Sequence, residues 1–332
     1  MKKYIGLLLV FGLFIACKQV TVAQSGEKHK HANVDGEDEP AYPKGFITTE
    51  YVAKAMNFLA GDELEGRDTG SQGYEMAAQF VEKEFKSLGI EPYFESYRDS
   101  LMAKGVGTFN VVGYLKGHDK VLANEFVIIG AHLDHIGKAD EVNGDSIANG
   151  ANDNAAGSSA VLALAKQLAE LKMNQRSILF VLFGAEEKGL LGSKHLAKVL
   201  KDKNIDLYTM VNFEMIGVPL NDKSYQAYIT GYDKSNMAAK INEYSGEELI
   251  GFLAKAKQFQ LFQRSDNYPF YQQFKVPCQT ISTFDFTNYE YYHHVDDETS
   301  EMNFEFMAEL INKCLPAVLK ISNTPSKEIK LN

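Results

Sequence analysis

The sequence is short of cysteine and of positive charge, and each shortage excludes a class of protein. Only three cysteines, Cys17, Cys278 and Cys314, occur among the 332 residues, which is too few for a small fold held together by disulfides. Asp and Glu number 44 against 34 Lys and Arg, so the formal net charge is −10. A general electrostatic attraction to nucleic acid is therefore not expected.

Two of the cysteines, Cys278 and Cys314, lie in apolar segments. We interpret them as small buried hydrophobic residues, which is the usual role of a free cysteine. A single bridge between them is the alternative in an oxidising compartment. The sequence also lacks internal repeats, and its hydrophobic content of 45% is ordinary for a globular protein.

The apolar run at the N-terminus is too short to span a membrane comfortably. It extends from Tyr4 to Ala16, follows two lysines and ends at Cys17. A basic start, a short apolar stretch and a small residue before the cleavage point are typical of an export signal. We therefore predict that residues 1–16 form a signal peptide.

The string LFIAC at 13–17 resembles the bacterial lipobox, although Phe14 stands where aliphatic residues are usual. This resemblance implies that Cys17 is lipidated and becomes the first residue of the mature chain. It also implies an exported protein, lipid-anchored to the bacterial cell envelope in the periplasm or at the outer membrane. Simple secretion is the alternative. The polar stretch 17–44 is predicted to be a flexible tether and 45–332 a single domain.

Beyond the tether, apolar strands alternate with amphipathic helices. The predicted strands are Tyr93–Tyr97, Phe109–Leu115, Phe126–Gly130, Ile178–Phe183, Tyr208–Phe213 and Pro277–Ser282. The predicted helices are Thr48–Leu59, Ser71–Gly89, Ala155–Leu171, Gly189–Leu200 and Glu301–Leu319. This alternation predicts an α/β fold with a mostly parallel, mixed central sheet and helices on both faces.

Side chains that can bind metal follow the ends of these strands. They are His132 and Asp134, Asp153 before a helix, the pair Glu186 and Glu187, Glu214, and His293 and His294 after the last strand. Taken singly, each has an ordinary structural role. Because the carboxyl ends of parallel strands meet at one edge of a sheet, the fold would gather them there. Imidazole and carboxylate ligands suit zinc, so we predict a catalytic zinc site at this edge.

The residue types suggest how such a site would work. Asp153 is the favoured bridge between two ions because a carboxylate has two oxygens to share. Asp134 is placed to accept the second ring proton of His132. Of the adjacent Glu186 and Glu187, one would bind metal while the other takes a proton from the activated water.

Five strings together resemble the co-catalytic di-zinc aminopeptidases. These strings are GAHLDHIG, NGANDNAAG, LFGAEEKGLLGS, VNFEMIG and YYHHVDDET, and they occur in the order found in that family. The family includes relatives of bacterial leucyl aminopeptidase, plasma glutamate carboxypeptidase and glutamate carboxypeptidase II. The resemblance extends from about Thr48 to Leu319 and implies a zinc-exopeptidase-like fold with two Zn²⁺ per chain.

Carried over residue by residue, the resemblance assigns most of the roles. It implies that His132 binds one zinc, Asp153 bridges the two ions and Glu187 binds the second zinc. It implies that Glu186 is the general base. It also implies that Asp134 does not bind metal itself but holds the ring of the ligand His132.

The last two ligands are less direct matches. Glu214 occupies a position that is often aspartate in the family, so the ligand is one methylene longer. The final ligand is a histidine followed four residues later by an acid. His293 with Asp297 meets that spacing and His294 does not, so the resemblance favours His293.

The resemblance implies an aminopeptidase that hydrolyses N-terminal residues of peptides with a metal-activated water. Its partners would be peptide substrates, and the membrane only through the N-terminal lipid. Alternatives are a carboxypeptidase or dipeptidase of the same family, a glutaminyl-peptide cyclotransferase-like acyltransferase with one zinc, or a non-catalytic binding domain.

Two further groups are weaker candidates. Asp266 lies in a segment that resembles a family loop and could line the substrate pocket. Three tyrosines close to the last ligand, Tyr289, Tyr291 and Tyr292, are candidates to donate to a developing oxyanion.

Overall fold

A computed structural model describes residues 47–332 of the chain. The predicted signal peptide (1–16), the lipidation site Cys17 and the tether (17–44) lie outside these residues and stay predictions. Among the described residues, none of the helices combines the length and the hydrophobicity that a bilayer span requires.

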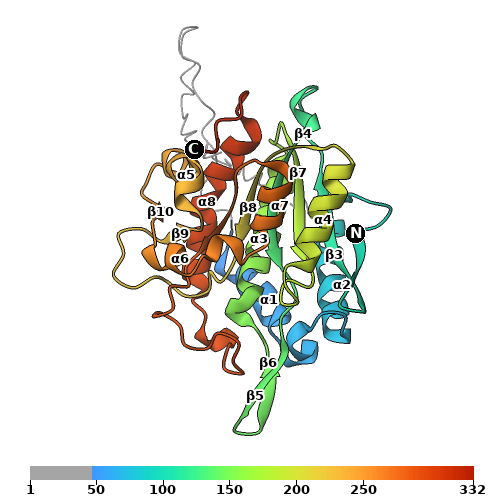
Figure 1. Cartoon of the computed structure of the whole chain (residues 1–332), viewed down its shortest axis with the longest axis vertical. Coiled ribbons are helices and arrows are strands. Elements are labelled where there is room, and N and C mark those ends of the chain that lie inside the picture. The colour runs from blue at the N-terminus through green and yellow to red at the C-terminus, as the bar shows by residue number, and fades with distance from the viewer. Residues whose placement is uncertain (1–46) are drawn as a thin grey trace, which may run out of the picture. The chain divides into compact units, whose positions relative to one another are not determined.

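A mixed sheet forms the centre of the molecule (Figure 1). Its strands are β1 (Glu91–Pro92), β2 (Arg98–Ala103), β3 (Val106–Leu115), β4 (Glu125–His132), β7 (Ser177–Phe183), β8 (Asp206–Phe213), β9 (Ala227–Ile229), β10 (Ile250–Gly251) and β11 (Cys278–Ser282). The order is β1-β3-β7-β4-β8-β11-β9-β10, and β2 pairs with β3. The central strands β7, β4, β8 and β11 are parallel, whereas β3 and β9 are antiparallel to their inner neighbours.

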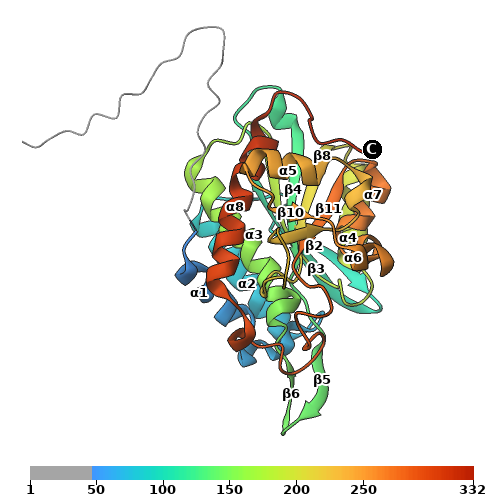
Figure 2. The same ribbon diagram turned by 90° about the vertical axis from the view of Figure 1, so that its left-hand side faces the viewer.

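Helices cover both faces of this sheet (Figure 2). They are α1 (Thr49–Leu59), α2 (Gln72–Ser87), α3 (Gly157–Leu171), α4 (Leu191–Asp202), α5 (Met237–Ser245), α6 (Ala254–Gln258), α7 (Asn267–Phe274) and α8 (Phe304–Asn323). α1, α3, α5 and α8 pack together on one face, and α4 packs with α7 on the other. The α/β class, the mixed sheet and the two helical layers predicted from the sequence are confirmed.

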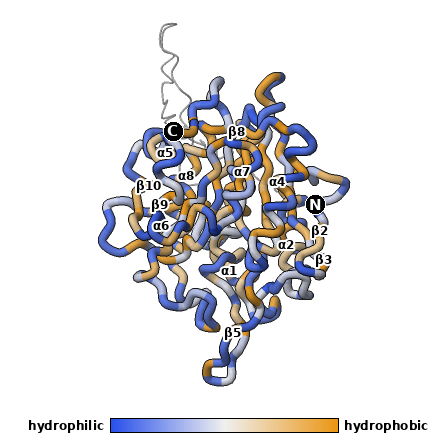
Figure 3. Tube along the Cα trace, viewed as in Figure 1, coloured by the Kyte–Doolittle hydropathy of each residue, from blue (hydrophilic) through white to orange (hydrophobic). Residues whose placement is uncertain are grey.

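The core is divided between the two faces of the sheet. In β7, Phe180 belongs to the cluster under α1, α2, α3 and α8, while the neighbouring Val181 belongs to the cluster under α4 and α7. All seven residues of β7 are buried, as expected for a strand covered on both sides. Figure 3 shows hydrophobic stretches along the central strands and hydrophilic stretches in the peripheral loops.

The predicted helix starts are confirmed at both capping residues. The Thr48 side chain accepts from Tyr51 N and the Ser71 side chain from Tyr74 N, each satisfying a free donor of the first turn. Both cysteines beyond the tether are free and buried, so they form no bridge with each other in this structure. Their interpretation as small buried residues is confirmed.

Two elements differ from the expectation. The predicted strand Tyr93–Tyr97 is wrong, because this segment is an irregular link between β1 and β2. A hairpin of β5 (Gly137–Val142) and β6 (Asp145–Ala148), which the sequence did not predict, projects from the body of the molecule (Figure 1).

Candidate metal centre

The predicted ligands are gathered because the parallel strands end at the same edge. His132 is the last residue of β4 and lies in register with Phe183, the last residue of β7. β8 lies on the other side of β4 and ends at Phe213, directly before Glu214. Residues that follow these strand ends therefore emerge side by side, as the position of sites in parallel sheets leads one to expect.

Asp153 reaches the site from a tight turn between β6 and α3. Gly150 begins this turn in the left-handed region, with φ of 60°, and the turn continues over Ala151–Ala156. The Asn154 side chain fastens it to the end of β8 by donating to Phe213 O at 3.0 Å. Asp153 itself is only 3% exposed. The turn thus holds one carboxylate in a buried, fixed position.

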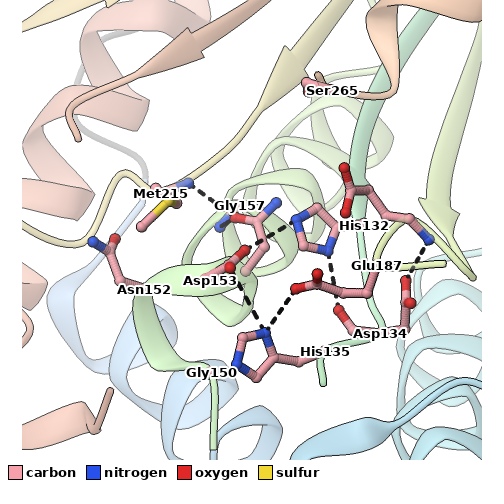
Figure 4. Close-up of polar contacts among 12 residues, drawn as sticks. His132, Asp134, His135, Gly150, Asn152, Asp153, Gly157, Glu187, Met215 and Ser265 are labelled. Atoms are coloured by element: carbon pink, nitrogen blue, oxygen red, sulfur yellow. Dashed lines mark hydrogen bonds and ion pairs between the residues drawn. The ribbon is translucent and has the colours of Figure 1, made fainter. Parts of the chain in front are cut away.

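Four side chains bring potential ligand atoms within 4.8 Å of one another: His135, Asp153, Glu187 and His293. His135 Nδ1 lies 3.1 Å from Glu187 Oε1 and 3.7 Å from Asp153 Oδ2 (Figure 4). His293 Nε2 lies 3.2 Å from each of the same two oxygens. Imidazole nitrogens and carboxylate oxygens at these separations form a donor set of the kind that binds zinc.

The two oxygens of Asp153 face different partners. Oδ1 lies 3.2 Å from His132 Nε2, while Oδ2 faces His135 (Figure 4). Oδ2 also faces His293 Nε2. Burial raises the pKa of Asp153, but its close contacts with the His132 and His293 rings and the charges of His135 and His132 outweigh this effect, so the pKa is lowered from its usual value. The carboxylate is therefore ionised and shared between two groups of donors, as a bridging ligand would be.

The expected contact between His132 and the Asp134 carboxylate is wrong. His132 Nδ1 instead lies 3.0 Å from the main-chain oxygen of Asp134. The carboxylate accepts from the Thr69 hydroxyl at 2.9 Å and from Glu186 N at 3.0 Å. The chain turns directly after His132, so the carbonyl of Asp134 meets the ring while its side chain points to the loop that carries Glu186. Asp134 thus contacts the His132 ring through its main-chain oxygen and the Glu186 N–H through its carboxylate.

His135 was not among the predicted ligands, yet it is fully buried in the cluster. It is held there by its main-chain N–H, which donates to Arg67 O at 3.2 Å. The sequence signal for it is weak: a second histidine three residues after His132, in a loop whose path the sequence does not determine. His294, by contrast, is outside the cluster and pairs with Asp296 at 3.4 Å.

Glu186, Glu214 and Asp266 add further acidic groups to the same region. Burial raises the pKa of Glu186 well above its usual value, and the negative charges of Asp266 and Glu214 raise it further. Burial likewise raises the pKa of Glu214 to about 7 and that of Asp266 to about 7, although nearby His132 lowers both. Three carboxyl groups are thus crowded together in a mostly buried region.

This region fits a divalent cation. Within residues 47–332, His135 Nε2, His293 Nε2 and Glu214 Oε2 are buried and make no hydrogen bond, and neither oxygen of Asp266 makes one. Buried polar atoms normally find a partner, so such a concentration of unpaired donors and carboxylates needs an explanation. Positive ions among these side chains would satisfy the unpaired atoms and offset the crowded negative charge.

Arg67 lies beneath the site and ties its loops together. Its guanidinium, fully buried, donates to Leu133 O at 2.8 Å, to Asn149 O at 2.6 Å and to Gly150 O at 3.0 Å, and also to Leu59 O. These carbonyls belong to the loop after β4, to the turn before Asp153 and to the end of α1. The Arg67 side chain thus links the segments that present His135 and Asp153.

The last loop supports the site from a different side. Asp297 is buried and accepts from Asn152 N at 2.7 Å, from Asp153 N at 3.1 Å and from the Tyr289 hydroxyl at 2.6 Å. Because its hydroxyl is bound in this way, Tyr289 is not free to donate to a substrate. Tyr292 instead stacks on His293, with ring centroids 4.0 Å apart, and remains exposed.

Sequence comparison identifies relatives of this chain. The sequence profile described as peptidase family M28 matches residues 110–318. Leucine aminopeptidase 2 of Trichophyton equinum is 29% identical over 179 residues, which are 53% of this chain and 34% of that protein. The chain therefore spans about a third of the length of this curated relative.

Comparison with solved structures supports the fold. BSAP, a zinc aminopeptidase from Bacillus subtilis, matches with a TM-score of 0.65 at 15% identity over 86% of this chain and 97% of that chain. The glutaminyl cyclase of Porphyromonas gingivalis matches with a TM-score of 0.63 at 12% identity over 83% and 99%. At these identities the two comparisons show a shared fold and no more. One of these two proteins is an aminopeptidase and the other a glutaminyl cyclase, so this fold occurs with two different reactions.

Proposed function

Because the chain belongs to peptidase family M28, we propose that it is a zinc-dependent aminopeptidase that removes N-terminal residues from peptides. One observation carries the proposal: His132, His135, His293 and Glu187 surround the two oxygens of Asp153. The name of its fungal relative, a leucine aminopeptidase, supports action at the amino end. Peptides would be the substrates.

We assign two zinc ions to the site on the basis of the two faces of Asp153. Glu187 and His293 lie on the side of Oδ2 and would hold one ion. His132 lies on the side of Oδ1 and would hold the other together with Glu214, whose Oε2 is buried and unpaired. When bound, zinc supplies Lewis acidity that polarises the scissile carbonyl and makes water acidic enough to lose a proton near neutral pH.

Glu186 is the proposed general base. It follows the end of β7 next to Glu187, and its main-chain N–H is fixed by the Asp134 carboxylate at 3.0 Å. Burial and the neighbouring acids raise its pKa, which makes its carboxylate a stronger proton acceptor. Glu186 would take a proton from the attacking water and then donate it to the leaving amine.

The proposal is tested with a small set of free and N-blocked peptides, with and without a chelator, and with products identified by mass. We expect release of the N-terminal residue only, its loss on N-blocking or chelation, and its recovery with zinc. A peptide that begins with glutamine separates the two chemistries of the fold, since a cyclase would eliminate ammonia and release no residue. Elimination of ammonia alone would replace the proposal with the cyclase.

A pair of variants tests the base. Glu186→Gln removes the proton acceptor and keeps the shape, so we expect kcat to fall by about 10²-fold or more while zinc remains bound. Glu290→Gln, an exposed residue of the last loop, is the matched control and should retain full activity. Undiminished turnover in Glu186→Gln would remove Glu186 from the mechanism.

We also propose that the protein is exported and anchored to the bacterial cell envelope through a lipidated Cys17. The support is the basic and apolar N-terminus followed by the lipobox-like string at 13–17. Labelling with a radioactive fatty acid in a bacterial host tests this, with Cys17→Ser as the comparison. Label in the wild-type chain and none in the variant is the expected result, and equal labelling of both would contradict it.

A further inference from the structure

A cavity of about 170 Å³ lies directly beside the proposed metal centre. Glu214 lines one part of it, and so does Tyr292, which stacks on His293. The remaining lining comes mainly from the ends of β9 and β11 and from the segment around Arg264. A group bound next to the zinc ions can therefore extend into this cavity.

Most of the cavity wall is apolar or has its polar atoms occupied. Phe284 and Phe286 supply aromatic surface. The Tyr228 hydroxyl donates to Phe284 O at 2.7 Å, and Ser282 Oγ accepts from Phe284 N at 3.2 Å. These hydroxyls are already engaged within the protein, so they do not determine which charge the cavity prefers.

Arg264 is the exception in this wall. Among residues 47–332, its guanidinium has no hydrogen bond, ion pair or ring contact, and the side chain is exposed. The other arginines of the described chain are all engaged: Arg67 by carbonyls, Arg98 by Glu75 and Glu82, and Arg176 by Glu125. An unpaired guanidinium at the edge of a cavity is a ready partner for an anion, and its fork geometry matches a carboxylate.

We propose that this cavity binds a carboxylate of the substrate through Arg264. The inference rests on the proposed peptidase function, because it gives that same site a substrate class. A peptide can bring a carboxylate from two sources: an acidic side chain on the residue to be released, or the free carboxyl end of a short peptide. Glu214 is the one acidic residue of the cavity lining, and the zinc ion that it would hold would offset its negative charge. The cavity would then carry the net positive charge of Arg264.

The test uses the zinc-reconstituted full chain and three related compounds. Leucyl-leucinamide has no carboxylate, glutamyl-leucinamide has one on its first side chain, and leucyl-leucine has one at its end. kcat and KM are measured for the wild type, Arg264→Gln and Arg264→Lys. Lys234→Gln is the matched control, because it removes an exposed positive charge that lines a separate cavity.

We expect Arg264→Gln to lower kcat/KM roughly tenfold for one of the two carboxylate compounds, mainly through KM, and to leave leucyl-leucinamide unchanged. Arg264→Lys should restore part of the loss and Lys234→Gln should have no effect. A loss confined to glutamyl-leucinamide identifies the acidic side chain as the ligand. A loss confined to leucyl-leucine identifies the carboxyl end, and hence a preference for very short peptides.

Two results would overturn the inference: an equal change for all three compounds, or no change for any. If none of the compounds is cleaved, the peptidase proposal fails, and the cavity is then tested separately. The same compounds serve as ligands in calorimetry, where a carboxylate compound should bind the wild type more tightly than Arg264→Gln. Equal binding by both proteins would reject the carboxylate site independently of turnover.

Discussion

At the scale of single residues, Asp297 determines how Asp153 is presented although it is not itself a proposed ligand. Its carboxylate accepts from two consecutive main-chain N–H groups, those of Asn152 and Asp153. Charged acceptors make strong hydrogen bonds, and mutation of residues that orient a metal ligand typically lowers metal affinity by about 10- to 100-fold. Asp297 therefore acts on the metal through the main chain of the turn.

We predict that Asp297→Asn weakens zinc binding by about 10- to 100-fold, because an amide nitrogen would then oppose one of the two N–H donors. Titration with zinc against a competing chelator measures the effect. Asp296→Asn changes the neighbouring exposed residue and should bind zinc as the wild type does. Equal affinity of both variants and the wild type would show that Asp297 only fills space.

His135 and Asp134 mark the limit of what the sequence indicates at this scale. The strand ends at Phe183 and Phe213 could be predicted from apolar runs, and the run Phe126–Gly130 stops two residues before the end of β4 at His132. The gathering of the side chains that follow these strands could be predicted in the same way. The direction of each side chain in the loop after β4 could not, because it depends on the path between His132 and the contact of His135 with Arg67. For this reason the partner of His132 was assigned to the wrong atom of Asp134.

At the scale of elements, the start of α4 is packed against the loop that carries the two glutamates. A Cβ added to Gly192 would lie 2.0 Å from Gly184 O and 2.3 Å from Asn110 Oδ1. Asn110 in β3 also accepts from Gly184 N at 3.1 Å and donates to Gly192 O at 3.0 Å. The absence of a side chain at Gly192 therefore lets strand, loop and helix meet.

We predict that Gly192→Ala destabilises the protein by about 1–3 kcal/mol, because the helix must move away from the loop that precedes Glu186. Urea unfolding measures the stability, and peptide hydrolysis should fall with it. Gly107→Ala is the control, since the nearest atom to its added Cβ is Met102 Sδ at 3.9 Å. A loss in Gly192→Ala no greater than in Gly107→Ala would contradict the packing argument.

The sequence predicted the central elements better than the peripheral ones, for a physical reason. β4, β7, β8 and β11 are mostly buried on both faces, and β4 and β7 therefore appear as continuous apolar runs in the sequence. Tyr93 and Phe94 also give an apolar pattern but form no strand; the Tyr93 ring packs on Phe94 and on Tyr114. The exposed hairpin β5–β6 lacks an apolar run and gave no signal.

At the scale of the whole molecule, the site concentrates mostly buried carboxyl groups whose negative charge a bound cation would offset. Six carboxyl groups are brought together there: Asp134, Asp153, Glu186, Glu187, Glu214 and Asp266. Like charges that share a buried site repel, so the folded state without metal is under electrostatic stress. A ligand that binds the folded state alone adds to its stability by mass action.

We predict that a chelator lowers the thermal midpoint by about 5 °C or more and that zinc restores it in a concentration-dependent way. Thermal scans of the wild type and of two single variants measure this. His294→Ala should keep the full zinc-dependent shift, whereas His293→Ala should lose much of it, because only His293 lies among the donors. A full zinc-dependent shift in both variants would show that neither histidine holds metal, and an equal loss in both would contradict the assignment of His293 alone.

The buried Arg67 has a consequence for the minimal length of a working chain. The segment that matches the family begins at residue 110, and a fragment of 110–318 would contain every proposed ligand. It would nevertheless omit the guanidinium, and the carbonyls of Leu133, Asn149 and Gly150 would be left facing empty space or water. A chain trimmed to the recognisable segment would thus carry the proposed ligands on loops that lack the hydrogen bonds of Arg67. We therefore expect the segment that contains Arg67 and the end of α1 to be needed for metal binding.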